Sequence, residues 1–322
     1  NMTFEDQAEA AQTLSLEGYN LKWQDDFSEA TLNKADWNVE AHPAGWVNQE
    51  KQKYVNSTDN IYLEDGKLVI KPIKTVDENG EATYTSGRIN TQNKHNFKYG
   101  IFEARIKVPK GKGYLPAFWL MAADENKYGQ WPRCGEIDIM EVMGDNTAKG
   151  YGTIHYGNPH KESQGTVTLS NNTFADSYHD VAVEWLPGKI NWYIDGVLFH
   201  SEDNWYSRTE GQGENTYPAP FDQEFYMILN LAVGGSWVGN PDETTEFDNQ
   251  SYSIDYVKVY QKDSYDENVT KPESDVTLRD PDATGNYIIN GNFATVEDLT
   301  DDKDWKSLTA LGGAAVAEIN NN

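Results

Sequence analysis

Cysteine is nearly absent from the sequence: Cys134 is the only one in 322 residues, which excludes an intramolecular disulfide. No Cys/His signature surrounds it, so a thiol nucleophile is not expected. Basic residues are scarce too, with 26 lysines and arginines against 52 acids and a net charge of −26. Phosphate binding needs a basic face, so we expect no nucleic-acid partner, and an anionic membrane surface is disfavoured.

Long apolar runs and helical periodicity are missing as well. No apolar stretch is long enough to span a membrane, so we predict no integral membrane segment. No basic segment followed by an apolar core opens the sequence, so we expect any secretory signal to have been removed already. The chain is 38% hydrophobic and 12% aromatic, with 10 tryptophans and 19 tyrosines. This composition suits a globular core and aromatic platforms for sugar rings.

From about Leu21 to Gln261 the sequence reads as strands and turns. Residues 99–109 alternate apolar and polar side chains, which indicates a half-buried strand. Residues 180–201 contain two turn signals, a Pro-Gly and an Asp-Gly pair, and predict three strands joined by tight hairpins. Residues 225–235 are almost continuously apolar, as in a buried central strand. Further strands are predicted at residues 66–73, 84–91 and 252–261. We therefore predict one antiparallel β-sandwich of roughly 240 residues.

The composition divides the chain into four parts. Residues 1–18 are interpreted as a leader segment and residues 19–262 as the β-domain. Residues 263–305 hold twelve acids against three bases, and residues 263–283 are predicted to be an acidic linker. Residues 284–322 regain order signals but are too few to hold a core of their own, so they are interpreted as part of a second domain.

The most informative stretch is WPRCGEIDIMEVMG, residues 131–144, because it places three acids among apolar residues. Successive side chains of a strand point to opposite faces, so Glu136 and Asp138 share one face. Regular alternation would put Met140 beside them and Glu141 on the other face. A one-residue β-bulge near Met140 resets the alternation, so we predict such a bulge and three acids on one concave face.

Converging carboxyl groups on a strand suit one chemistry in particular. Two carboxyl groups about 5 Å apart are the arrangement of a retaining glycosidase, with one as nucleophile and the other as acid/base. The middle acid would hold a proton between them and raise the pKa of the acid/base. Two other interpretations stay open. One is a metal site, although hard cations prefer loops that offer carbonyls and waters, and the other is a purely structural row of acids.

The segment GEIDIME, residues 135–141, resembles the active-site signature of glycoside hydrolase family 16 in its bulged form. Other segments resemble the family in the same order along the chain: residues 48–55, 84–91, 97–121, 131–144, 152–157 and 230–237. The resemblance covers about residues 20 to 261. It implies a β-jelly-roll sandwich of two curved antiparallel sheets, with a substrate cleft across the concave sheet.

The resemblance implies a role for each acid: Glu136 is the nucleophile, Asp138 the helper and Glu141 the acid/base. It also implies substrate contacts from Asn48, Glu50, Arg88, Trp119, Trp131, His155 and Trp237. Each aromatic side chain has the alternative of packing in the core, and His155 has that of a satisfied structural histidine.

Many members of the family also bind one calcium ion on the convex face, far from catalysis. The resemblance implies Asp26, the backbone carbonyl of Gly66 and Asp255 as the ligands of this structural calcium. Oxygen ligands from loops and a strand edge suit calcium. The alternative is that Asp255 only pairs with a nearby amide or base. No cofactor is expected for catalysis itself.

Within the family, the bulged motif, the preceding Trp-Pro and residues 230–237 resemble laminarinase-type endo-β-1,3-glucanases, which often accept mixed β-1,3/1,4-glucans. We therefore expect a β-glucan substrate. The alternatives are a non-catalytic glycan-binding jelly roll, a transglycosylase, or an enzyme for another polysaccharide such as agar. The acidic balance weakly opposes sulfated substrates. Residues 286–293 resemble the opening of a family 4-like carbohydrate-binding module. We expect a secreted, periplasmic or cell-surface monomer.

Overall fold

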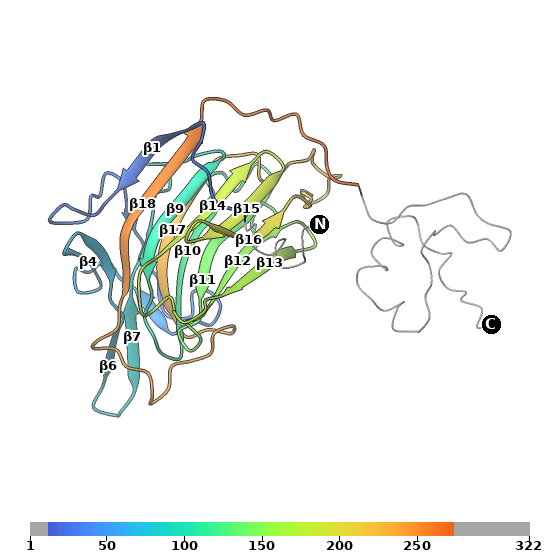
Figure 1. Ribbon diagram of the computed structural model, residues 1–322. Coiled ribbons are helices and arrows are strands. Elements are labelled where there is room, and N and C mark those ends of the chain that lie inside the picture. The colour runs from blue at the N-terminus through green and yellow to red at the C-terminus, as the bar shows by residue number, and fades with distance from the viewer. Residues whose placement is uncertain (1–11, 274–322) are drawn as a thin grey trace, which may run out of the picture. The chain divides into compact units, whose positions relative to one another are not determined.

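The computed structural model describes residues 12–273 of the chain, which are coloured in Figure 1. Residues 1–11, in the expected leader, and residues 274–322, with part of the expected linker and the expected second domain, lie outside the described residues. Within residues 12–273 the secondary structure consists of strands and turns, without a helix. This part of the chain accordingly has no helix that is long and apolar enough to cross a membrane.

Two large antiparallel sheets form the described domain. The first has the strand order β16-β15-β14-β9-β18-β5-β4, with β1 pairing onto β18. Its strands are β1 (Tyr19–Asp25), β4 (Ile61–Glu64), β5 (Lys67–Ile70), β9 (Gly100–Lys107), β14 (His179–Leu186), β15 (Lys189–Ile194), β16 (Val197–Glu202) and β18 (Tyr252–Lys262).

The second sheet has the strand order β13-β12-β11-β10-β17-β8-β2. Its strands are β2 (Asn38–Val39), β8 (Arg88–Asn90), β10 (Tyr114–Ala122), β11 (Glu136–Val142), β12 (Lys149–Tyr156), β13 (Lys161–Thr168) and β17 (Phe225–Val233). A small third sheet, which the sequence analysis did not predict, has the order β3-β7-β6. It consists of β3 (Gln52–Tyr54), β6 (Ile73–Val76) and β7 (Ala82–Ser86), and β3 runs parallel to β7.

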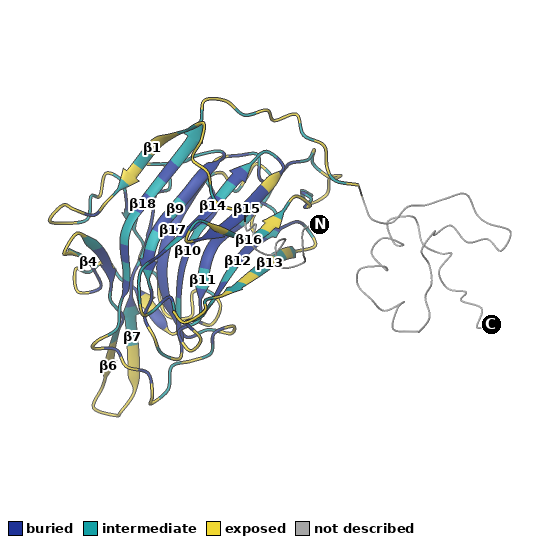
Figure 2. Ribbon diagram, viewed as in Figure 1, coloured by how far each residue is buried: buried dark blue, intermediate teal, exposed yellow. Residues whose placement is uncertain are grey.

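The two large sheets pack face to face around one hydrophobic core, which confirms the predicted jelly-roll β-sandwich. Figure 2 shows that the central strands are buried, whereas the edges and turns are exposed. All nine residues of β17 are buried, as the continuous apolar run predicted. The three strands expected in residues 180–201 are β14, β15 and β16, joined in sequence by tight hairpins.

The prediction of one continuous strand is wrong for two segments, each of which contains parts of two strands. Residues 66–73 divide into β5 and β6, and residues 84–91 divide between β7 and β8; in each case the two halves join different sheets. Pro72 follows β5, and proline has no N–H for a strand ladder. Gly87 separates β7 from β8, and a Cβ added there would lie only 2.6 Å from Cγ1 of Ile61. The chain therefore changes sheet where it passes close to another strand.

The predicted β-bulge is present in β11. Ile139 and Met140 together oppose the single residue Gly152 of β12, and the register of β11 against β10 shifts at the same place. Both bulged side chains are fully buried. Because two consecutive residues face the core, Glu141 returns to the face of Glu136, as predicted.

Glycines on β12 and β13 let the opposite sheet approach the bulge. A Cβ on Gly152 would lie 2.4 Å from Cδ1 of Trp192, and a Cβ on Gly165, its partner on β13, would lie 2.2 Å from Cγ of His200. The Trp192 indole fills this space and donates a hydrogen bond of 2.9 Å to the carbonyl oxygen of Asp138. A buried tryptophan therefore supports the bulge from the core side.

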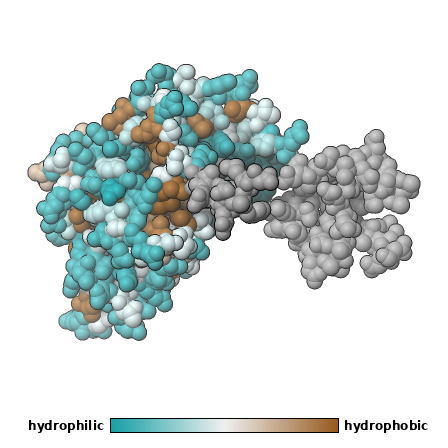
Figure 3. Space-filling model, in the orientation of Figure 1, coloured by the Kyte–Doolittle hydropathy of each residue, from teal (hydrophilic) through white to brown (hydrophobic). Residues whose placement is uncertain are grey.

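The surface drawn in Figure 3 is mainly hydrophilic, with small separate apolar patches. The exposed large hydrophobic side chains of the described residues include three tryptophans, Trp46, Trp131 and Trp237, at 41%, 45% and 45% exposure. Burial would stabilise these large indole rings. Their exposure therefore indicates a binding surface more strongly than the exposure of a single leucine or valine does.

We predict that Gly152→Ala destabilises the fold. The new methyl group would overlap the Trp192 ring, and overpacking of this kind costs about 1–3 kcal/mol. Gly213→Ala is the matched control, because Gly213 has open space around its Cα and its φ lies outside the strained region. Urea unfolding followed by tryptophan fluorescence measures the free energy of unfolding of each variant. Equal values for the two would contradict the packing described at the bulge.

Candidate active site

The register of the second sheet aligns three rows of side chains across its open face. Directly paired residues of antiparallel strands point to the same side, so each acid of β11 belongs to one row. The rows contain Glu136 with Met121, Tyr226, His155 and Glu162; Asp138 with Trp119, Ile228, Asn90, Thr153 and Gln164; and Glu141 with Ala117, Asn230, Arg88, Tyr151 and Thr166. The structure thus brings the expected Arg88, Trp119 and His155 into the rows of the acids.

The three carboxyl groups of β11 are close together and largely withdrawn from water. Asp138 is 2% exposed and lies within hydrogen-bonding reach of Glu136 and Glu141. Burial, and then the charge of the neighbouring acid, raise the pKa of Glu136 and that of Asp138 well above their ordinary values. Burial and the charge of Glu136 raise the pKa of Glu141 to about 8. The row therefore retains protons at neutral pH.

Glu136 has two neighbours that favour its charged form. Nε1 of Trp131 donates a hydrogen bond of 3.1 Å to Oε1, and Nε2 of His155 lies 3.6 Å from Oε2. Both contacts oppose the effect of burial on the pKa of Glu136. His155 also approaches Oδ2 of Asp138 at 3.2 Å, a buried oxygen that has no hydrogen bond in the described structure.

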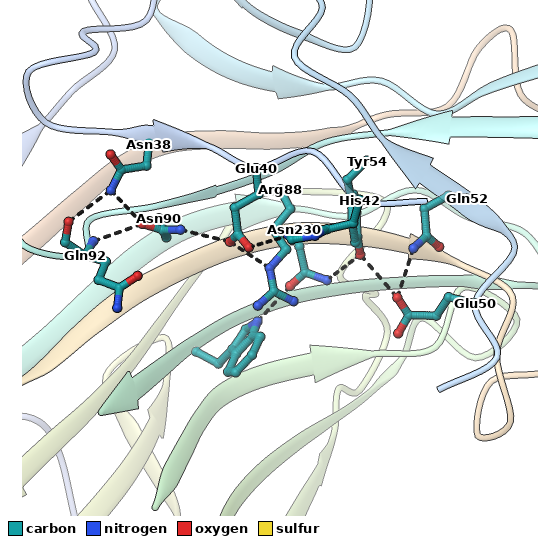
Figure 4. Close-up of polar contacts among 11 residues, drawn as sticks. Asn38, Glu40, His42, Glu50, Gln52, Tyr54, Arg88, Asn90, Gln92 and Asn230 are labelled. Atoms are coloured by element: carbon teal, nitrogen blue, oxygen red, sulfur yellow. Dashed lines mark hydrogen bonds and ion pairs between the residues drawn. The ribbon is translucent and has the colours of Figure 1, made fainter. Parts of the chain in front are cut away.

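A polar network links residues of β8, β17 and β3, and Figure 4 draws its side chains. It lies beside the acids, because Arg88 and Asn230 belong to the row of Glu141. Nε of Arg88 donates to Oε2 of Glu40 at 2.8 Å, and its guanidinium lies 4.9 Å from the centre of the Trp119 ring. Nε1 of Trp119 donates to Asn230 at 2.7 Å, and Asn230 donates to the hydroxyl of Tyr54 at 3.1 Å. These contacts hold the half-buried Trp119 indole in one orientation.

Asn48, Glu50 and Trp237 lie at the other end of this network. Glu50 is buried and accepts a hydrogen bond of 3.3 Å from the Asn48 amide. The Asn48 carbonyl accepts a hydrogen bond of 2.9 Å from the N–H of Ser236, which ties its loop to the loop of Trp237. The Trp237 ring meets Tyr151, in the row of Glu141, edge-on at 5.0 Å. All three expected residues therefore lie near the acids.

Indole rings flank the acid row on both sides. Trp131 lies beside Glu136, while Trp237 lies beside the row of Glu141. Trp46, further out, stacks on His42 at 3.4 Å and lies 5.1 Å from the guanidinium of Arg88. Core packing does not account for Trp131 or Trp237, since each is 45% exposed. Flat apolar surfaces beside polar groups are suited to sugar rings.

The sequence analysis did not single out several residues of this face: Glu40, Trp46, Tyr151, His160, Glu162 and Asn230. One signal was available, because Asn230 is an amide within the apolar strand β17 and a buried polar group needs a partner. The contacts of the others depend on strand register and on turns, as with Trp46 beneath Arg88. Composition and spacing do not specify those contacts.

The expected calcium ligands lie on the first sheet, not on the sheet of the acids. Asp26 follows β1, Gly66 is in the β4–β5 turn, and Asp255 is on β18, which pairs with both β1 and β5. Oxygen donors from these positions fit calcium in their chemistry. However, Asp255 pairs with Lys67 at 3.5 Å and with Arg105 at 3.7 Å, as the alternative interpretation expected. A calcium ion would replace these cations as the partner of Asp255.

The fold and the site together define a class of protein. Carboxyl groups share protons on the open face of a β-sandwich, and exposed indole rings lie on either side of them. This arrangement is typical of the active site of a glycoside hydrolase. The comparison with known families agrees, because residues 46–258 match the model of glycosyl hydrolases family 16. The chain belongs to this family.

Two curated relatives and one solved structure support this assignment. The chain is 40% identical over 267 residues to glucan endo-1,3-beta-glucosidase A1 of Niallia circulans, covering 77% of this chain and 39% of that protein. It is 36% identical over 253 residues to glucan endo-1,3-beta-glucosidase of Cryptopygus antarcticus, covering 74% and 91%. The chain therefore spans well under half of the first relative and nearly all of the second. The catalytic domain of a laminarinase from Thermotoga petrophila RKU-1 matches with a TM-score of 0.64 at 35% identity, covering 76% of this chain and 99% of that chain.

We predict that Glu141→Gln stabilises the protein at alkaline pH only. The folded protein keeps the Glu141 proton up to a pKa of about 8, whereas the unfolded chain releases it near the ordinary value of 4.5. The folded state thus binds more protons between these values, and stability is lost as the pH rises from the lower to the higher. Glutamine carries no charge and avoids this loss. We expect equal melting temperatures near about pH 4 and an advantage of about 10 °C for the variant near about pH 9.

Differential scanning calorimetry at both pH values measures this effect. Glu78→Gln is the control, because Glu78 is exposed in the β6–β7 turn, and we expect no advantage there that depends on pH. If the advantage of Glu141→Gln were the same at both pH values, the raised pKa of Glu141 would be wrong.

Proposed function

We propose that the protein is a retaining endo-glycosidase that hydrolyses internal β-1,3 linkages of β-glucans. The observation that carries the proposal is the row of Glu136, Asp138 and Glu141, which the bulge aligns on one face with shared protons. Family membership supports hydrolysis of a glycosidic bond. The names of the two curated relatives, both glucan endo-1,3-beta-glucosidases, support the linkage.

The contacts of the two glutamates support different roles for them. Glu136 accepts an N–H from Trp131 and faces His155, which favours the charge that a nucleophile needs. Glu141, with a pKa of about 8, holds its proton at neutral pH, as a general acid must. Asp138 lies within reach of both, and its own raised pKa lets it hold a proton that would otherwise neutralise Glu136.

In the first step, Glu136 attacks the anomeric carbon and Glu141 gives its proton to the departing glycosidic oxygen. The bond from the anomeric carbon to that oxygen breaks as the bond to Glu136 forms. In the second step, Glu141 takes a proton from water while the water oxygen displaces Glu136 from the same carbon. Each step inverts the anomeric carbon, so the product keeps the β configuration.

The exposed indoles support a neutral sugar chain as substrate. Trp131 and Trp237 offer flat surfaces on either side of the acids, with the half-buried Trp119 between them. Asn48, Glu50, Arg88 and His155 offer hydrogen bonds to sugar hydroxyls. The net charge of −26 disfavours sulfated polymers. Because a polysaccharide does not cross a membrane, we propose that the protein acts outside the cytoplasm, and that it acts as a monomer.

A purely glycan-binding jelly roll is the second candidate, and the acids argue against it. Burying carboxyl groups without full pairing costs stability, and a binding protein gains nothing from three of them in one row. Transglycosylation uses the same covalent intermediate, with a sugar hydroxyl in place of water. Products longer than the supplied oligosaccharide would identify that reaction.

We predict that laminarin hydrolysis first releases the β-anomer, because Glu136 and Glu141 lie on one face and the reaction proceeds through two inversions. Proton NMR during the first minutes of hydrolysis measures the anomer, and an α-anomer appearing first would overturn the mechanism.

Glu136→Gln should lower turnover by several orders of magnitude while oligosaccharide binding persists, since the shape is kept and the attacking charge is lost. A panel of laminarin, barley glucan, lichenan, agarose and xyloglucan tests the substrate.

We also propose that Asp26, the carbonyl of Gly66 and Asp255 hold one structural calcium ion, and that catalysis needs no cofactor. The support is the chemistry of the donors and their position on β18 and beside the ends of its partner strands β1 and β5. An ion that binds only the folded protein adds stability by mass action.

We expect calcium to raise the melting temperature of the parent protein, and Asp255→Ala to abolish that increase. Lys67→Met is the matched control, since it removes an ion pair of Asp255 but keeps the proposed ligand, so the increase should persist. Differential scanning fluorimetry with calcium chloride or with a chelator measures the difference for each variant. No calcium-dependent increase in the parent would rule out the site.

A further inference from the structure

The β12–β13 hairpin brings two histidines and a glutamate together next to the acids. His155 pairs directly with Glu162 across the two strands, and His160 lies in the connecting turn. Nδ1 of His155 is 2.9 Å from Nε2 of His160 and 3.5 Å from Oε2 of Glu162. One ligand atom from each residue lies within 4.8 Å of the other two.

These separations fit a transition-metal ion. In a tetrahedral zinc site with bonds of about 2.0–2.1 Å, neighbouring ligand atoms lie about 3.3–3.4 Å apart. The observed separations of 2.9 Å and 3.5 Å lie on either side of that value, so small side-chain rotations bring the ligands into place. Imidazole with carboxylate also suits a zinc-type ion, whereas calcium and magnesium prefer oxygen ligands alone.

The second ring nitrogen of His155 faces a carboxylate. Nε2 lies 3.2 Å from Oδ2 of Asp138, the buried oxygen that has no hydrogen bond in the described structure. A proton on Nε2 would satisfy Asp138 and leave the lone pair of Nδ1 directed at His160. Metal-binding histidines almost always donate their other N–H to such a partner. Asp138 therefore favours the tautomer of His155 that binds a metal.

The hairpin site is open to solvent on one side. His160 and Glu162 are exposed and His155 is half-buried, so an ion can enter and keep water as a fourth ligand. The Trp131 ring lies 5.9 Å from that of His155 and 5.2 Å from that of His160. An ion held here would therefore lie beside the exposed indole that also contacts Glu136.

We propose that His155, His160 and Glu162 bind a divalent transition-metal ion of the zinc type, and that the bound ion inhibits the enzyme. The inhibition, but not the binding, rests on the function proposed above. The ion would fix the His155 ring in the row of Glu136 and occupy space beside Trp131, where a sugar ring is expected to stack. Substrate and metal would then compete for one end of the site.

Isothermal titration calorimetry with zinc chloride tests the site in the metal-free protein without any substrate. We expect one zinc ion per chain, and a Kd at least about tenfold higher in His160→Gln and in Glu162→Gln. His95→Gln is the matched control. Residues 12–273 contain two overlapping groups of three potential ligands, the hairpin group and the group of Glu136, Asp138 and His155. His95 pairs with Asp36 at 2.7 Å and belongs to neither group, so its variant should bind zinc like the parent. No binding to the parent, or equal affinity in all four proteins, would overturn the site.

Initial rates of laminarin hydrolysis at increasing zinc chloride test the inhibition separately. Zinc should lower the rate of the parent, excess chelator should restore it, and the half-inhibiting concentration should rise at least about tenfold in His160→Gln. An unchanged rate in a parent that binds zinc at this site would refute the inhibitory role. A protein that binds zinc at the hairpin but hydrolyses no polysaccharide would refute the proposed function and leave the metal site standing.

Discussion

The active face depends on one irregularity, the extra residue in β11. Without it Glu141 would point into the core, where an unpaired carboxylate is very costly, and Met140 would lose its place there. The bulge needs room on the neighbouring strand, and Gly152 provides it by admitting the Trp192 ring. That indole also bonds the carbonyl of Asp138, at the point where the bulge disrupts the ladder. A backbone irregularity, a glycine and a buried indole therefore act as one unit that positions the acids.

The surroundings of the acids explain why the row keeps protons instead of pairing with a permanent cation. Arg88 lies in the row of Glu141, yet its guanidinium is bonded to Glu40, and against the effect of burial this pairing lowers the pKa of Glu40. The ion pairs of Glu136 and Asp138 in the described structure are with His155, whose charge is conditional. A lysine in place of that histidine would be a permanent cation and would favour ionisation of the acid row. Glu141, the proposed general acid, thus keeps its proton because the arginine in its row is engaged by Glu40.

The fold could be predicted from the sequence wherever the signal was local. Alternation in residues 99–109, turn dipeptides in residues 180–201 and the misplaced Glu141 each predicted an element that the structure contains, because strand periodicity and turn chemistry act over a few residues. Residues 66–73 alternate as a single strand does, and alternation does not reveal that its two parts join different sheets. The roles of the site residues came from family resemblance and remain predictions. Contacts such as that between His155 and His160 require the direction of a side chain leaving a turn, which spacing does not determine.

Asp138 shows why an acid, and not an amide of the same shape, fits the middle of the row. Its one carboxyl group lies within reach of Glu136 and Glu141 and also faces Nε2 of His155. A carboxyl group can share a proton with a glutamate through one oxygen while the other accepts from an imidazole N–H. An asparagine must turn its NH₂ group toward one side. If the NH₂ group faced His155, Nε2 would have to be unprotonated and the ring proton would move to Nδ1. That proton would block the Nδ1 lone pair that is directed at His160. If the NH₂ group faced the glutamates, it could donate a hydrogen bond but could not exchange a proton. The same carboxyl group therefore serves proton sharing on the β11 side and the choice of tautomer on the β12 side, and this links the acid row to the hairpin site.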